Sequence, residues 1–353
     1  MFVIVGLFIY AREFELVLSI DCAHKIIMST IMVGKQAISP PVLLSPLAGI
    51  TDLPFRNLVS SFGAGLVVSE MVASHEMMKK GKEAHARAEL GLNVESTSVQ
   101  IAGCEAYWMS ECAKLIADKG AKIIDINMGC PAKSVVNGAS GSALMKTPDL
   151  ALELIEAVVN AVDIPVTLKT RLGWDHDSLN AAQLAVSAEQ IGIQMITIHG
   201  RTRCQFYKGS ADWHRIRDVK NAVNIPVIAN GDIIDTLTAK KAIKNSGADG
   251  VMIGRGAQGK PWILAQIASD LYGTAPPIVP QGNDLNIMIS NHYMSMLDFY
   301  GDFHGNKVAR KHLGWYMDYI GVDTSIRRSL QTELNPNKVL NIIANLPAEK
   351  AIA

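Results

Sequence analysis

Two side chains of this sequence, Cys130 and Lys169, are of types that do chemistry and stand in unusual surroundings. Cys130 lies in the segment Asn-Met-Gly-Cys-Pro at 127–131, where the glycine and the proline indicate a fixed loop that can present the thiol to a cavity. A thiol with an ordinary pKa of about 8.5 is mostly protonated at neutral pH, which suits a general acid better than a nucleophile. A nucleophile activated by a distant base such as His199 remains an alternative.

Lys169 stands in the apolar, β-rich run 165–171. An ammonium group that points into an apolar interior is costly unless it is paired or used. Three interpretations follow. The lysine forms a Schiff base with a carbonyl substrate, or it stabilises negative charge at the N1 and O2 edge of a reduced flavin, or it is held in a salt bridge with Glu70.

The elements that must position these residues follow a regular rhythm of short apolar runs and amphipathic helical patterns. Helical segments such as 148–162 and 179–191 lie between the runs, each with apolar residues on one face. Strands that alternate with helices must pair in parallel, and eight such units close into a (β/α)8 barrel, the TIM barrel. An open doubly wound sheet is the second choice, but its Gly-x-Gly-x-x-Gly fingerprint is missing after the first run. The eight runs are 42–46, 65–70, 97–101, 122–127, 165–171, 194–199, 226–230 and 250–254.

The active site of such a barrel is built where the strands end. Every run of this sequence ends in or next to polar residues or glycine, and their joint placement at one end of the barrel favours a shared site. The segments after the last two runs, Gly231 and Gly254-Arg255-Gly256, are expected to hold a phosphate through backbone N–H groups. The candidate residues at the strand ends are Ser45 and Pro46, Glu70, Gln100, Asn127 and Cys130, Lys169 and Arg171, His199 and Arg201, Asn230, Gly231 and Asp232, and Gly254, Arg255 and Gly256.

The alternation stops near Gly273, which divides the chain into four parts. Residues 1–37 form an N-terminal extension of uncertain role, residues 38–273 the barrel, residues 274–284 a stiff proline-rich linker, and residues 285–353 a helical domain. Helical patterns over 286–300, 306–320 and 337–345 build that domain. It is too small to hold a large core alone and is expected to dock on the barrel.

The composition limits the classes of function. With 353 residues, 33 Lys and Arg against 33 Asp and Glu, the chain lacks the global positive charge of a non-specific nucleic-acid binder. Five cysteines without a Cys-x-x-Cys pair argue against a zinc site and a disulfide framework, and favour a reducing cytoplasm. We therefore expect no metal and no obligate protein partner.

The first residues differ in character from the rest. The apolar run 2–10 is too short to span a bilayer and has no basic start of a secretion signal, so we expect no membrane association. An interfacial anchor is the alternative. The preferred interpretation is an upstream extension, with Met28 or Met32 as another translational start.

If this protein binds RNA, local patches must do so, because the net charge is zero. Two groups of basic residues offer such patches, one in the loop after residue 199 and one on a single face of the helix 306–320, at spacings i, i+3 and i+4. Trp315, Tyr316 and Tyr319 on the same helix are expected in the core of the tail rather than as base-stacking platforms. The basic residues are Arg201, Arg203 and Lys208 in the loop, and Lys307, Arg310 and Lys311 on the helix.

At these residues the chain resembles the tRNA-dihydrouridine synthase family, most closely its bacterial B-type branch. The most specific motifs are Asn-Met-Gly-Cys-Pro at 127–131 and His-Gly-Arg-Thr-Arg at 199–203, and the resemblance runs from about residue 33 to near the C-terminus. The chain departs from the family at Leu47, where methionine is frequent. Further segments that carry the resemblance are 45–52, 98–103, 125–126 and 132–133 on either side of the first motif, 141–145, 169–174, 229–233 and 253–256.

The resemblance implies an FMN cofactor reduced by NADPH, with a hydride then passing from flavin N5 to C6 of a D-loop uridine in tRNA while Cys130 delivers a proton to C5. Reduction of a C5=C6 bond needs one hydride and one proton on adjacent carbons, which agrees with this division. The target base must leave its stack to reach the barrel mouth. The residues implied for the cofactor are Pro46, Leu47, Ala48, Gln100, Lys169, His199, Asn230, Gly231, Asp232, Gly254 and Arg255, and those expected for tRNA are Asn127, Arg171, Arg201, Arg203, Lys307, Arg310 and Lys311.

Three other functions compete with this one. An FMN barrel that acts on a free pyrimidine, of the dihydroorotate dehydrogenase kind, would share Lys169 and the phosphate loops but has no use for a basic tail. A Schiff-base lyase would use Lys169 and need no flavin. A flavin-free RNA-binding module would explain neither Cys130 nor Lys169.

Overall fold

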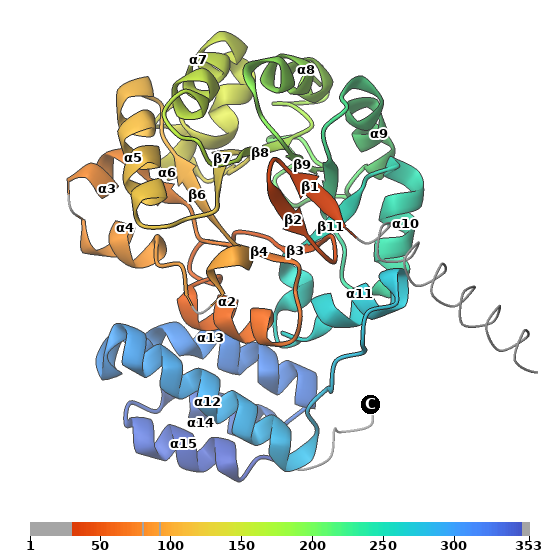
Figure 1. Ribbon diagram of the computed structural model, residues 1–353. Coiled ribbons are helices and arrows are strands. Elements are labelled where there is room, and N and C mark those ends of the chain that lie inside the picture. The colour runs from red at the N-terminus through yellow and green to blue at the C-terminus, as the bar shows by residue number, and fades with distance from the viewer. Residues whose placement is uncertain (1–29, 80, 92, 348–353) are drawn as a thin grey trace, which may run out of the picture.

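The computed structural model describes residues 30–79, 81–91 and 93–347, and the first 29 residues of the predicted extension lie outside this range. Eight parallel strands close into a barrel, as the eight apolar runs predicted (Figure 1). Closure is complete because β4 pairs with both β3 and β6. The barrel strands are β3 (Val42–Leu44), β4 (Leu66–Val68), β6 (Thr97–Ala102), β7 (Ile123–Met128), β8 (Val166–Arg171), β9 (Ile196–His199), β10 (Val227–Asn230) and β11 (Gly250–Ile253).

Strand register brings the polar residues to a common level in the barrel. All six residues of β6, β7 and β8 are buried, as is typical of parallel strands covered on both faces. Asn127 lies opposite Lys169, and His199 lies opposite both Arg171 and Asn230. Since these positions fall at or near the carboxyl ends of their strands, their side chains meet at one end of the barrel.

An outer ring of helices covers the barrel (Figure 1). Three of them begin at aspartates, because Asp52, Asp212 and Asp235 each accept a hydrogen bond from a backbone N–H in the first turn. Two helices predicted from the sequence form with shorter bounds. The helices are α2 (Leu53–Ser61), α3 (Ser74–Met78), α4 (Lys82–Arg87), α5 (Ala106–Asp118), α6 (Lys133–Val136), α7 (Pro148–Val159), α8 (Ala181–Ile191), α9 (Trp213–Ala222), α10 (Thr236–Ser246) and α11 (Ile263–Tyr272), and a two-residue strand β5 (Val72–Ala73) extends the sheet beside β6.

A hairpin that the sequence analysis did not predict closes the floor of the barrel. Strands β1 (Ile31–Val33) and β2 (Gln36–Ile38) pair antiparallel and lie across the barrel end that faces the viewer in Figure 1. Val33 and Ile38 are buried in one cluster with Leu43, Leu66 and Ile228 from the barrel strands. The last residues of the predicted N-terminal extension therefore belong to the barrel's packing.

Four helices follow the barrel and pack beside α2 (Figure 1). They are α12 (Gly282–Tyr300), α13 (Asp302–Ile320), α14 (Thr324–Thr332) and α15 (Pro336–Ala344). The sequence analysis missed α14. Trp262, next to α11, is buried in the core of this helical tail, and its ring contacts those of Phe62 and Tyr319. No helix in the described ranges is both long enough and apolar enough to cross a membrane.

The close packing between the hairpin and the barrel strands can be tested by mutation. A Cβ at Gly65, which precedes β4, would lie 1.7 Å from the Pro40 carbonyl oxygen. We expect Gly65→Ala to destabilise the fold by about 3 kcal/mol, since only a backbone shift relieves the clash, and to lower the melting temperature by roughly 10 °C. Gly138→Ala is the control, because a Cβ there meets its nearest atom at an ordinary 3.5 Å. Equal melting temperatures for the two variants would contradict the close packing of the floor.

Candidate active site

A cavity of about 950 Å³ opens at the carboxyl ends of the barrel strands. Every residue predicted to hold the cofactor lines it, and so do Asn127, Cys130 and Arg171. The volume lies within the range typical of ligand sites. The lining also includes residues that were not predicted as site residues, among them Ile50, Met71, Pro131, Ala132, Phe206, Tyr207, Ile233, Ile234, Met252 and Gln258.

A chain of buried polar side chains holds the loop of Cys130. The Asp125 carboxylate accepts hydrogen bonds from Thr167 Oγ1 and Gln100 Nε2, both at 2.6 Å. Gln100 Oε1 in turn accepts one from Asn127 Nδ2 at 2.7 Å. Asn127 Oδ1 then accepts the backbone N–H groups of residue 129 at 3.1 Å and of Cys130 at 3.0 Å. Gln100 and Asn127 thus hold the backbone of the loop that carries the thiol.

Arg171 fixes the same loop from the other side. Its side chain is 1% exposed, and its Nε donates to the Gly129 carbonyl at 2.8 Å. Its Nη1 donates to the carbonyls of Thr202 and Phe206, both at 2.9 Å. The arginine expected to contact tRNA therefore lines the cavity while it ties two loops together.

Lys169 faces the cavity beside Asn230 rather than pairing with Glu70. Its Nζ donates to Asn230 Oδ1 at 3.1 Å, and Asn230 Nδ2 donates to the Met252 carbonyl at 2.8 Å. Glu70 accepts the backbone N–H of Gly49 instead. Burial, together with the positive charge of Arg171, lowers the pKa of Lys169 to about 8, which leaves the ammonium mostly protonated at neutral pH.

His199 is held neutral at the same level of the barrel. Burial and the positive charges of Lys169, Arg171, Arg201 and Arg255 lower its pKa well below the usual 6.5. Its Nε2 lies 3.4 Å from Arg201 Nη1, and no hydrogen bond of the described residues joins the ring to Cys130. The geometry therefore gives no support to a Cys130 nucleophile activated by His199.

The strand-end aspartate Asp232 organises the opposite wall. It adopts a left-handed backbone, with φ of 55°, directly after Gly231, with φ of 112°. Its carboxylate accepts Arg201 Nη1 at 2.9 Å and Arg201 Nη2 at 2.6 Å, and it lies 3.4 Å from Arg255 Nη2. A side chain at Gly231 would clash with His199 at 2.9 Å, so the turn requires glycine.

The predicted RNA-facing loop after residue 199 is arranged differently from expectation. Arg201 is 2% exposed and is fully engaged with Asp232 and with the carbonyls of Lys208 and Gly209. The Arg203 guanidinium stacks 4.6 Å from the ring centre of Trp174 and 5.0 Å from that of Phe206. The sequence shows the charge of these arginines but not the acid and rings that pair with them in the fold, and the prediction that they contact tRNA stays a prediction.

The basic face of α13 lies next to the mouth of the cavity. Lys307 and Lys311 are exposed and Arg310 is half-buried. A Cβ at Gly49, in the loop that lines the cavity, would lie 3.2 Å from Lys311 Nζ. Lys307 Nζ lies 3.7 Å from the ring centre of Phe303, which is 75% exposed. Among the predicted core aromatics of this helix, Tyr316 is buried.

The cavity fits a flavin nucleotide in its donor set. The backbone turns directly after β11 at Arg255–Ala257, where the first N–H groups of a helical turn have no partner within the turn. A Cβ at Gly256 would lie 2.6 Å from the Ile233 carbonyl oxygen, so the close approach of two strand ends requires glycine. Lys169 and Gln100 provide donors deeper in the cavity, which suits the polar edge of an isoalloxazine ring.

Two residues of the site escaped the sequence analysis. Asp125 was not singled out, although a carboxylate within an apolar run and two positions before Asn127 indicates a shared inward face. Tyr207 is 50% exposed beside the cavity, with the guanidinium groups of Arg171 and Arg255 at 5.6 and 5.1 Å from its ring centre. No sequence signal marks this tyrosine, because only the folded loop brings it to the mouth.

Comparisons with known proteins place the chain in a family. The model of the family described as "Dihydrouridine synthase (Dus)" matches residues 22–352. A "Probable tRNA-dihydrouridine synthase" of Rhodobacter capsulatus is 56% identical over 92% of this chain and 100% of its own length, and "tRNA-dihydrouridine synthase B" of Proteus vulgaris is 46% identical over 84% and 92%. The chain belongs to the dihydrouridine synthase family, as the resemblance predicted, and is a flavin-dependent oxidoreductase.

Solved structures with low sequence identity share the fold. A 2-naphthoyl-CoA reductase matches with a TM-score of 0.55 at 13% identity, over 70% of this chain and 52% of that one. Histamine dehydrogenase from a Rhizobium species matches with a TM-score of 0.52 at 12% identity, over 76% and 51%. The chain spans about half of each of these longer proteins, so the likeness concerns the barrel architecture.

The support of the Cys130 loop by Asn127 can be tested directly. Asn127→Ala removes the acceptor of two backbone N–H groups, each bond contributing about 1 kcal/mol. We expect amide exchange in the peptide that holds residues 129 and 130 to accelerate about tenfold or more. Asn137→Ala, at an exposed position in the same connection, should leave that peptide unchanged. Equal exchange in the two variants would show that Asn127 does not hold the loop.

Proposed function

We propose that this chain is an FMN-dependent tRNA-dihydrouridine synthase that uses NADPH to reduce the C5=C6 bond of a D-loop uridine. The observation that carries the proposal is that Cys130 and the cationic Lys169 line one cavity. Asn127 anchors the loop of Cys130 and lies opposite Lys169 on the neighbouring strand. A reaction that adds a hydride and a proton to adjacent carbons needs a redox cofactor and an acid side by side. The D-loop as the position of the target uridine is what the resemblance to the B-type branch implies.

Different residues of the cavity hold the ring, the ribityl chain and the phosphate of the cofactor. Bound FMN supplies the hydride. The apolar loop Pro46, Leu47 and Ala48 covers its ring, and Gln100 and Lys169 contact its polar edge. Lys169 is charged at neutral pH and balances negative charge there. The ribityl chain and phosphate are held by Asn230, Gly231, Asp232, Gly254 and Arg255, and neutral His199 completes the wall.

Cys130 acts as the general acid. The backbone of its loop is fixed by two hydrogen bonds, because the Cys130 N–H donates to Asn127 Oδ1 and the Gly129 carbonyl accepts from Arg171 Nε. The loop therefore holds the thiol at a defined place in the lining of the cavity. Proton transfer from a general acid depends on a fixed distance between the acid and the atom that receives the proton, and a rigid loop keeps that distance. Family membership sets aside the Schiff-base lyase and the flavin-free RNA-binding module, and the tail distinguishes this chain from an enzyme of free pyrimidines.

The tRNA would approach along the rim of the cavity. The target base leaves its stack and enters the mouth, where the half-exposed Tyr207 ring offers a surface for stacking. Lys307, Arg310 and Lys311 contact phosphates from α13, and Lys311 places that charge next to the cavity loop. We place this activity in the cytoplasm, with tRNA and NADPH as partners and without an obligate protein partner.

A pair of variants separates the two half-reactions. Cys130→Ala should retain FMN and its reduction by NADPH, but the formation of D-loop dihydrouridine, mapped in unmodified tRNA, should fall roughly 10²–10⁴-fold because the acid is lost. Lys169→Met should instead slow reduction of the flavin or weaken its retention, since it removes the cation from the cofactor's edge. Wild-type dihydrouridine formation by Cys130→Ala would exclude Cys130 as the proton donor. A wild-type protein that binds no flavin would exclude the proposed function.

The tRNA-binding role of α13 has a distinct signature in salt dependence. Replacing Lys307, Arg310 and Lys311 together by Ala should weaken tRNA binding and reduce the slope of log affinity against log salt by roughly 2, since each lost phosphate contact reduces it by somewhat under one. Flavin reduction by NADPH should not change.

The control removes the same number of charges elsewhere. Lys240, Lys241 and Lys244 are exposed in the second half of α10, which ends where the chain enters β11 at the floor of the barrel. Their replacement by Ala should leave both affinity and slope near the wild-type values. If the two triple variants bind tRNA with the same salt dependence, the face of α13 has no specific role.

A further inference from the structure

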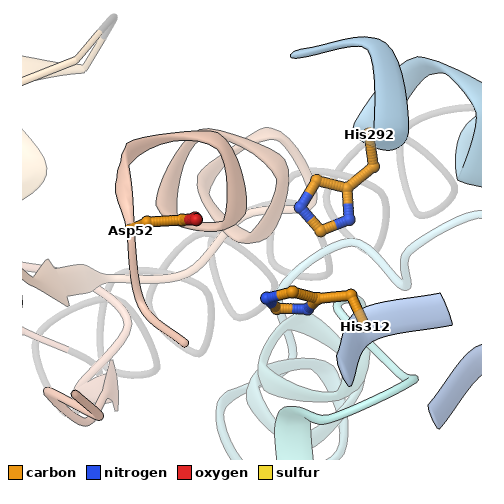
Figure 2. A group of neighbouring side chains, drawn as sticks. All are labelled: Asp52, His292 and His312. Atoms are coloured by element: carbon orange, nitrogen blue, oxygen red, sulfur yellow. The ribbon is translucent and has the colours of Figure 1, made fainter. Parts of the chain in front are cut away.

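Three side chains from distant parts of the sequence meet where the helical tail packs on the barrel. Asp52 begins α2, His292 lies in α12 and His312 in α13, and all three are buried. One ligand atom of each, a carboxylate oxygen or a ring nitrogen, lies within 4.8 Å of the other two. Figure 2 shows a nitrogen of each histidine ring turned toward the Asp52 carboxylate. The cluster lies outside the set of residues that line the cavity.

Four buried polar atoms of this cluster make no well-formed hydrogen bond, namely Asp52 Oδ2, His292 Nε2 and both ring nitrogens of His312. The Tyr300 hydroxyl is a polar neighbour of Asp52, and the Ile50 backbone is one of His312. The other carboxylate oxygen of Asp52 accepts the Phe55 N–H at 3.0 Å, and His292 Nδ1 lies 2.9 Å from the Tyr316 hydroxyl. Buried polar atoms without hydrogen bonds are rare and destabilising, so several that face one another indicate a ligand among them.

The carboxyl group of the cluster has no ion-pair partner within the described residues. The charges of Glu70 and Arg56 act on Asp52, the Tyr300 hydroxyl is a hydrogen-bonding neighbour of it, and the charge of Lys311 acts on His312. A cation bound directly to a buried carboxyl group stabilises its charged form. Burial lowers the pKa of His312 to about 3 and that of His292 well below its usual value, and the neutral imidazole is the form that ligates a metal.

We propose that Asp52, His292 and His312 bind one divalent transition-metal ion of the zinc type. Two imidazole nitrogens and one carboxylate oxygen are a donor set that Zn²⁺ accepts. The contact of Tyr316 with the second nitrogen of His292 is the outer hydrogen bond by which metal-binding histidines are oriented. The expectation of no metal site rested on cysteine spacing, and this site uses no cysteine.

The ion would join the tail to the barrel. Zinc–ligand bonds of about 2.0–2.2 Å place tetrahedral ligand atoms roughly 3.3–3.6 Å apart, so binding draws the three donors together by on the order of 1 Å. Asp52 follows the loop that lines the cavity, and His312 adjoins Lys311, which reaches Gly49 of that loop. The bound ion would therefore fix α12 and α13 against the mouth of the barrel. This site does not depend on the proposed function.

Metal content and thermal stability of the untagged, full-length protein test the proposal. After incubation with Zn²⁺ and removal of excess by gel filtration, we expect about one zinc per chain by mass spectrometry. Treatment with a strong chelator should lower the melting temperature by about 5 °C or more, because an ion bound only to the folded state stabilises it, and added Zn²⁺ should restore it. A wild-type protein that takes up no zinc and whose melting temperature responds to neither reagent would overturn the proposal.

Variants assign the ion to this cluster. His312→Gln should lose the bound zinc and the response of the melting temperature to Zn²⁺, whereas His304→Gln, an exposed histidine of the same helix, should retain both. Zinc retained by His312→Gln at the wild-type stoichiometry would place the ion elsewhere and overturn the assignment. Because the wild-type measurement stands by itself, a failure of His312→Gln to fold does not remove the test.

Discussion

The Asp125 carboxylate, buried inside the barrel, is the group on which the arrangement of the site depends. Burial raises the pKa of this carboxyl group, and a buried polar group must be matched by hydrogen bonds, which Thr167 and Gln100 provide. Gln100 is thereby oriented to receive Asn127, which in turn fixes the backbone of the Cys130 loop. The thiol thus takes its position from a network rooted in three neighbouring strands, and a rigid scaffold of this kind keeps a reacting group in place.

The electrostatics of the mouth follow from the same geometry. Burial, together with the positive charges of Lys169, Arg171, Arg201 and Arg255, keeps His199 neutral. Asp232 neutralises part of this charge through Arg201 and Arg255. The remaining positive potential suits an anionic, phosphate-bearing ligand, which is consistent with a flavin nucleotide in a flavin-dependent oxidoreductase.

Two segments that are not part of the barrel's repeat pack on it at different places. The hairpin β1–β2 packs Val33 and Ile38 into the floor. At the side of the barrel, α12 and α13 pack against α2, with Trp262 inserted into the core of the tail. The proposed metal ion would act at this second contact, where the histidines of the tail meet the aspartate that caps α2. A tail held rigidly at the mouth would present its basic face in a fixed position relative to the cavity.

The sequence by itself determined the barrel and the residues at its strand ends, because buried parallel strands leave local apolar runs and their carboxyl ends must converge. It also singled out Cys130 and Lys169, which the fold places in the lining of one cavity. Only the tertiary structure decided that Arg201 and Arg171 are buried and join neighbouring loops by hydrogen bonds. Their partners are backbone carbonyls and an aspartate that no local sequence pattern connects to them. The floor hairpin and the cluster of His292 and His312 with the cap of α2 likewise depend on packing between segments remote in sequence, which leaves no periodic trace in the chain.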